Sequence, residues 1–102
     1  MNSKNSKIPV AQIGTKHGHA DGVLIVMLEN NDVEVKGVFE PDTERVKYLK
    51  KLNVYPWNQV IFFESQDQLL LDPLIKIVAS EGLNIESLAH TYQILKSGKH
   101  VF

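Results

Sequence analysis

The sequence contains no cysteine, and this absence excludes several kinds of small protein. A disulfide scaffold and a cysteine-based zinc site are both ruled out, and the absence is compatible with a reducing compartment. The sequence also has no large excess of one charge: it contains 11 Lys and Arg and 12 Asp and Glu, for a net charge of −1. The chain therefore lacks the electrostatic footprint of a protein that binds nucleic acid or an acidic membrane surface.

Long apolar runs are also missing. No stretch approaches the roughly 20 apolar residues of a membrane span, so no membrane partner is expected. Residues 1–7 are polar and lack the apolar segment of a signal peptide, so we expect a frayed end and a cytoplasmic protein. The remaining segment, 8–102, has the length and hydrophobic content of one globular domain with a modest core.

The domain is expected to begin with a strand, a tight turn and a helix. An apolar strand is predicted at 8–13, a polar glycine-containing turn at 14–20, and apolar residues at helical spacing follow at 23–28. In a parallel α/β sheet, such a turn presents backbone N–H groups at the positive end of a helix dipole. An anion can bind there.

The turn matches the nucleotide-binding pattern Gly-x-Gly-x-x-Gly only in part. Gly14 occupies the first glycine position, whereas Lys16 and His19 occupy the second and third, and Gly18 comes one place early. By itself this is a weak motif, and its weight comes from the order of the elements around it.

The rest of the chain alternates between strand and helix patterns. Further strands are expected at 33–39, 60–63 and 74–79, and a fifth strand is expected to begin at 99–102. Helices are expected at 43–52 and 85–95, and a short helix is expected to start at the N-cap residues 65–68 and continue through 69–71. This order predicts a three-layer, Rossmann-like, doubly wound parallel α/β sheet of about four to five strands with right-handed crossovers. In the usual strand order, 3-2-1-4-5-6, the chain would supply strands three, two, one and four with at most a stub of strand five. The strand at 74–79 would then be a hydrophobic edge of the sheet. We expect either a longer enzyme or a homo-oligomer paired through that edge.

Three segments resemble the N-terminal domain of the Gfo/Idh/MocA oxidoreductases: the turn at 14–20, the acidic Glu-Pro-Asp at 40–42, and Ser-Gly-Lys-His-Val at 97–101. The similarity covers about 8–102. In that family, a Glu-Lys-Pro-like segment with a catalytic lysine comes next, followed by the rest of the Rossmann sheet and a substrate domain. The resemblance therefore implies a partial NAD(P)-binding domain that is incomplete relative to the full domain and carries no catalytic residue.

The resemblance places a dinucleotide across the carboxyl ends of the strands. Gly14 would let the backbone approach a pyrophosphate, and Lys16 would either offer its ammonium to a phosphate or point into solvent. Glu40 would bind the adenosine ribose hydroxyls and favour NAD, with NADP possible because of Arg45, or it would be an exposed residue before a proline turn. The candidate cofactor-binding residues are Gly14, Thr15, Lys16, His17, Gly18, His19, Glu40, Pro41, Ser80, Glu81, Gly82, Asn84 and Lys99.

Several of these residues have alternative roles. His17 and His19 have the spacing of a metal pair, but without a third ligand they are expected to cap the helix or line the cofactor loop, and no metal is assigned. In the loop 80–84, relatives carry a Thr-Pro-Asn-like segment that touches the nicotinamide half, and only Asn84 matches clearly. Glu81 would bind a ribose hydroxyl or be a solvated turn residue. Lys99 would serve the cofactor or the helix C-terminus.

The leading expectation is therefore the dinucleotide-binding part of an oxidoreductase that transfers hydride between NAD(P) and a sugar or polyol. The cofactor would carry the chemistry, and this part would bind and orient it. The alternative is a non-enzymatic Rossmann-like module for nucleotide binding or dimerisation, because a fold does not imply a function. A metal protein that depends on His17 and His19 is the third hypothesis.

Overall fold

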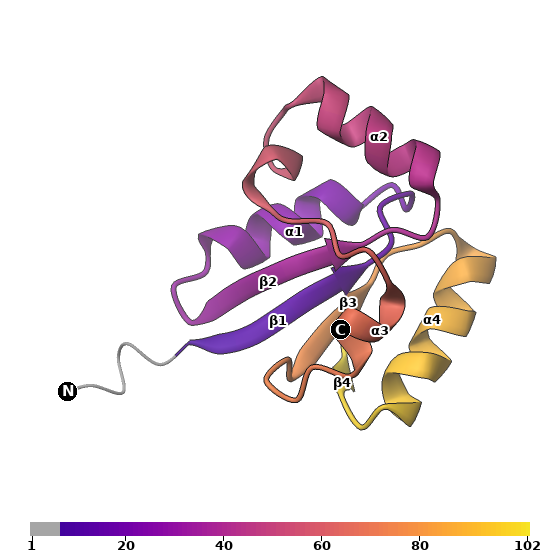
Figure 1. Cartoon of the computed structure of the whole chain (residues 1–102). Helices are drawn as coiled ribbons and strands as arrows, with labels where there is room; N and C mark the ends of the chain where they lie inside the picture. Colours follow the sequence, from indigo (N-terminus) through magenta and orange to yellow (C-terminus); the bar gives the residue numbers. More distant parts are fainter. Residues whose placement is uncertain (1–6) are drawn as a thin grey trace.

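The computed structural model describes residues 7–102, apart from the side chains of Asn84 and Ile85; the predicted frayed end, 1–7, lies outside the described residues except for Lys7. One parallel sheet runs through the molecule in the order β2-β1-β3-β4 (Figure 1). Its strands are β1 (Ile8–Ile13), β2 (Val33–Phe39), β3 (Ile77–Ser80) and β4 (His100–Val101). The predicted doubly wound parallel sheet is thus confirmed, with the first strand at its centre.

Helices connect the strands. They are α1 (Ala20–Glu29), α2 (Thr43–Leu52), α3 (Gln66–Leu70) and α4 (Asn84–Lys96), with a short 3₁₀ helix η2 (Trp57–Gln59) after α2. Asp42 begins α2 by accepting hydrogen bonds from the first-turn amides of Glu44 and Arg45. Ser65 caps α3 in the same way through the amide of Gln68. Such side-chain caps satisfy amides that have no partner within the helix.

The sheet lies between two helical layers. α1, α2 and η2 cover one face, where Val10, Val38 and Ala79 point. α3 and α4 cover the other face and pack on Ile13 and Val78 (Figure 1). Both faces of a parallel sheet need this cover, because its strands are apolar on both sides. Within residues 7–102, no helix is both long enough and apolar enough to cross a membrane.

The predicted strand at 60–63 is wrong in extent. Only one isolated bridge joins this segment to β2, between Val38 and Phe62. β2 changes register against β1 just before Gly37, and such a bulge bends and twists a strand. The ring of Phe63 lies over Gly37, where a Cβ atom would come within 2.9 Å of it. The segment therefore crosses the edge of β2 instead of running along it.

The strand predicted at 74–79 starts later, at Ile77. The residues just before β3 form a turn that starts at Asp72. The carboxylate of Asp72 accepts a hydrogen bond from the amide of Leu74, and its carbonyl accepts one from the amide of Ile75. The expected beginning of a fifth strand is the two-residue β4, which pairs with β3.

Candidate functional site

Three crossover loops meet at the carboxyl end of the sheet. They are the β1–α1 loop at 14–19, the β2–α2 loop at 40–42, and the β3–α4 loop at 81–83. α1 lies on one face of the sheet and α4 on the other, so the chain diverges between β1 and β3. In doubly wound sheets, ligands bind in the crevice outside this divergence point. We call the region between the three loops the mouth.

Gly14 joins two of these loops by direct backbone contact. Its φ angle is +94°, and a Cβ atom at this position would lie 2.3 Å from the amide nitrogen of Gly82. A glycine is therefore required for the β1–α1 and β3–α4 loops to touch. The group that approaches Gly14 closely on this side is the chain's own backbone, and the predicted approach of a pyrophosphate to Gly14 stays a prediction. Gly18, in contrast, has open space on its Cβ side.

Glu40 is buried at the base of the mouth, with 3% of its surface exposed. One carboxylate oxygen accepts hydrogen bonds from the amide and the hydroxyl of Thr15, at 2.9 and 2.6 Å. The other accepts from the amide of Asp42 at 3.0 Å. A buried carboxylate needs such donors to offset its lost hydration. The alternative of an exposed residue is wrong, and the predicted contact with ribose hydroxyls meets a carboxylate that already accepts hydrogen bonds from the β1–α1 and β2–α2 loops.

Arg45 braces the same turn from the first turn of α2. Its guanidinium donates from Nε to the hydroxyl of Thr15 at 3.1 Å and from Nη2 to the carbonyl of Thr15 at 3.2 Å. Beside it lies a polar hollow of about 260 Å³, next to the N-terminus of α1. The hollow is lined by Thr15, Lys16, His17, Gly18, Asp21, Arg45 and Trp57. Sequence reasoning gave Arg45 only an influence on cofactor choice and gave Trp57 no role.

Lys16 spans the mouth instead of pointing into solvent. Its ammonium lies 2.7 Å from a carboxylate oxygen of Asp42 and 4.0 Å from one of Glu86. The hydrogen bond with Asp42 raises the pKa of Lys16 and lowers the pKa of the Asp42 carboxyl. The ammonium is therefore held as a cation between the β2–α2 loop and α4.

His17 and His19 brace the β1–α1 loop from within. Their rings meet edge to face with centroids 5.1 Å apart, and Nδ1 of His17 accepts a hydrogen bond from the amide of His19. The same Nδ1 atom lies 3.9 Å from a carboxylate oxygen of Glu81. Among the described residues, no group of three His, Cys, Asp or Glu could hold a metal ion.

The β3–α4 loop carries the other candidates. Burial raises the pKa of Glu81, an effect that His17 and His19 oppose. Ser80 turns toward α4, with its hydroxyl 3.2 Å from that of Ser87. Asn84 is the first residue of α4, and its side chain lies outside the described part of the structure.

His90 is a residue near the mouth that sequence reasoning missed. It is buried under Gly82, and its Nδ1 atom has no hydrogen-bond partner among the described residues. Burial lowers the pKa of His90, so the neutral ring is favoured. His90 lies on the buried side of α4, as core residues do, so the sequence gives no indication that it lies near the mouth.

Lys99 is not part of the mouth. It precedes β4, and β4 starts level with the first residue of β3, which is the amino end of the sheet. Its buried ammonium donates to the carbonyls of Asp72 and Ile75, at 2.5 and 2.8 Å. Burial lowers the pKa of Lys99. The assignment of Lys99 to the cofactor is corrected accordingly, because strand direction separates it from Gly14 by the length of the sheet.

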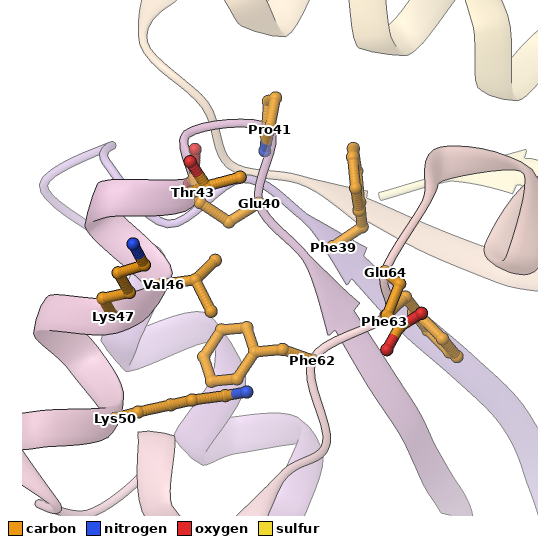
Figure 2. A pocket seen from close by; sticks show the side chains of 10 residues that line it. All are labelled: Phe39, Glu40, Pro41, Thr43, Val46, Lys47, Lys50, Phe62, Phe63 and Glu64. Atoms are coloured by element: carbon orange, nitrogen blue, oxygen red, sulfur yellow. The ribbon is translucent and has the colours of Figure 1, made fainter.

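A second hollow of about 330 Å³ lies beside the end of β2, between α2 and the segment 62–64. Figure 2 shows the side chains of Val46 and Phe62 pointing into it, with Lys50 below the ring. Pro41 is exposed at its rim, next to buried Glu40. The apolar surface of this hollow therefore adjoins the β2–α2 loop of the mouth.

Solved structures resemble this fold closely, although no protein-family model and no curated protein matches the chain. A protein named as an oxidoreductase from Erwinia carotovora atroseptica SCRI1043 is 29% identical over 94% of this chain, with a TM-score of 0.73. An NAD-binding protein from Listeria innocua is 20% identical over 94%, with a TM-score of 0.70. GenD2 from gentamicin A biosynthesis, solved in complex with NAD, is 15% identical over 94%, with a TM-score of 0.64.

The chain spans only 26–27% of the length of these three proteins. The neighbours are named as oxidoreductases or as NAD-binding proteins. The predicted Rossmann-like fold, partial relative to the full domain, is therefore confirmed.

Proposed function

We propose that this chain is the dinucleotide-binding part of a Gfo/Idh/MocA-like oxidoreductase and that it binds NAD or NADP across the mouth. The observation that carries the proposal is the meeting of the α1 N-terminus, two cationic side chains and a polar hollow at the divergence point of the sheet. The NAD complex of a neighbour with the same fold supports it. Hydride transfer to a sugar or polyol belongs to the proposal for a whole, longer protein.

The residues present fit the phosphates of a dinucleotide. The backbone N–H groups of Lys16 and Gly18 have no acceptor among the described atoms, and the space above Gly18 is open. Both groups lie beside the positive end of the α1 dipole, which favours an anion. The cations of Lys16 and Arg45 line the same hollow. We assign the phosphates to Lys16, His17, Gly18 and His19.

The remaining assignments follow the order of the loops. We assign the adenosine half to Pro41 and the apolar hollow beside β2, and the nicotinamide half to Glu81, Gly82 and Asn84. In this proposal Glu40 does not contact the dinucleotide; it positions the β1–α1 and β2–α2 loops through its hydrogen bonds with Thr15 and the amide of Asp42. Because its carboxylate is already satisfied, the negative charge that would repel a 2′-phosphate is shielded, and we expect NADPH as well as NADH to bind.

The chain's part in the reaction is to bind and orient. When bound, the dinucleotide supplies the hydride chemistry. The backbone amides fix its phosphates, while the Gly14–Gly82 contact fixes the distance between the loops that would carry its two halves. We assign no catalytic residue to this segment.

Titration with NADH and NADPH tests the proposal through Trp57. This single tryptophan lines the polar hollow and is 8% exposed, so a dinucleotide bound there should quench its emission. We expect saturable quenching in the micromolar range, weakened at least tenfold by Gly18→Val, whose side chain would fill the open space.

Gly22→Val is the matched control, because this glycine also has open space around it but does not line the hollow. A folded sample whose fluorescence, corrected for absorption by the nucleotide, shows no saturable change up to millimolar NADH or NADPH would contradict the proposal. Sedimentation analysis of that sample would then test the alternative of a dimerisation module.

A further inference from the structure

One side chain connects two loops of the mouth with the first turn of α4. Lys16 comes from the β1–α1 loop, Asp42 from the β2–α2 loop and Glu86 from the first turn of α4. The ammonium of Lys16 lies 2.7 Å from Oδ2 of Asp42 and 4.0 Å from Oε2 of Glu86. The cation thus bridges the gap between the loops at the position where the nucleotide-binding pattern has its second glycine.

The two carboxylates are fixed, whereas the lysine is not. Oδ1 of Asp42 accepts from the amides of Glu44 and Arg45, which leaves Oδ2 for Lys16. Oε1 of Glu86 accepts from the amide of Leu83 at 3.0 Å, which leaves Oε2 for the same ammonium. Each acid is therefore held by its own helix N-terminus.

Lys16 makes its contacts through a flexible four-carbon stem, so it is the group that can move. All three side chains are partly exposed, at 27% for Lys16, 39% for Asp42 and 33% for Glu86. Ion pairs this exposed are weak, because water screens the charges. A phosphate group is a stronger competitor for the ammonium, since it offers more negative charge and more acceptor oxygens.

We propose that Lys16 is an exchangeable electrostatic strap that closes the mouth in the free protein and passes from Asp42 and Glu86 to a phosphate of the incoming dinucleotide. This inference rests on the proposed function and adds to it the residues that set affinity. The carboxylates of Asp42 and Glu86 compete with the dinucleotide for the ammonium of Lys16. Once the ammonium has moved, these carboxylates repel the phosphates of the dinucleotide. Neutralising either acid should therefore tighten binding, and removing the lysine should weaken it.

Isosteric variants test the strap in the full chain. Asp42→Asn keeps an N-cap side chain, because asparagine caps as well as aspartate, and Glu86→Gln keeps an acceptor for Leu83. We expect each to lower the Kd for NADH about threefold to tenfold, and Lys16→Met to raise it at least tenfold. Glu34→Gln is the matched control, since it removes the same charge from an exposed pair with Lys36 on β2. It should leave the Kd unchanged.

A second measurement follows the strap directly. Carbon-13 NMR titration of the Asp42 carboxyl in the wild-type chain should give a pKa below the ordinary value without ligand, since the hydrogen bond with Lys16 lowers it. Saturation with NADH should move this pKa back toward the ordinary value.

The outcomes separate this inference from the proposed function. NADH binding with an unchanged Asp42 titration and unchanged affinity in both acid variants would overturn the strap and leave dinucleotide binding intact. Binding by Asp42→Asn or Glu86→Gln but not by the wild-type chain would support the strap. No binding by any folded variant would overturn both.

Discussion

Replacing Gly14 with alanine should destabilise the whole domain. The backbone there has a φ angle of +94°, and the added methyl carbon would lie 2.3 Å from the amide nitrogen of Gly82 and 2.7 Å from the carbonyl carbon of Glu81. Both contacts are with backbone, which cannot rotate away as a side chain can. The β1–α1 and β3–α4 loops would have to separate.

Three contributions set the size of the effect. A left-handed conformation costs an L-residue about 1–2 kcal/mol. Overpacking of a closely packed site costs about 1–3 kcal/mol. Alanine also restricts the unfolded chain, which returns about 0.4–1 kcal/mol. We expect the free energy of unfolding to fall by about 2–4 kcal/mol, a large part of the total for a domain of this size.

Urea denaturation followed by the emission of Trp57 and by circular dichroism measures this change. The midpoint should fall by about 1–2 M at a slope of about 2 kcal/mol per molar urea, which is the middle of the range for small domains. Gly18→Ala is the control, since Gly18 has open space and no left-handed φ angle, and its stability should change by less than about 1 kcal/mol. Equal stability of the Gly14 and Gly18 variants would refute the loop contact. The result matters for binding studies, because a bulky residue at Gly14 would abolish binding by unfolding the mouth.

Three further changes test other parts of the structure. Glu40→Gln should lower the free energy of unfolding by about 1–3 kcal/mol in urea titrations, because an amide group would face the donors of Thr15 and Asp42; unchanged stability would contradict the buried hydrogen bonds. Burial raises the pKa of Glu81, so its contribution to stability is lost as the pH rises above 4.5. Glu81→Gln should therefore flatten the decline in stability from pH 4.5 toward neutrality, and parallel curves would contradict this. Burial lowers the pKa of Lys99 below 10.5, so the unfolded chain binds more protons in the window below that pH. Relative to Lys99→Met, the wild-type chain should gain stability as the pH rises toward 10.5, and a constant difference would show that burial does not affect the charge.

Much of the fold could be predicted from local patterns. The strands at 8–13 and 33–39 and the helix at 43–52 have the predicted bounds, because each is apolar at the right period and ends at a clear signal. The segment at 60–63 has an equally apolar sequence, yet it makes one bridge only. The difference comes from the bulge in β2 and the packing of Phe63 on Gly37, neither of which local sequence encodes.

The candidate site was only partly predictable. The strand order predicted that the loops after β1, β2 and β3 meet at the carboxyl end of one sheet, and they do; the role of these loops in binding stays a prediction. The burial of Glu40 depends on Thr15, 25 residues earlier in the chain, so an acid before a proline gives no sign of it. The prediction for Lys99 was wrong although the strand order contained the answer: a residue just before a strand of a parallel sheet lies at the amino end of the sheet, away from the mouth.

The sealed position of Glu40 limits how this protein could be re-engineered. In attempts to switch a Rossmann enzyme between NAD and NADP, the acid after the second strand is a natural first target. Here that acid supports the turn from beneath, so replacing it would lower the stability of the fold as well as change the charge beside the turn. Pro41 is exposed in the same loop, and under the proposed function it is a position where coenzyme preference could be altered at less cost to the scaffold.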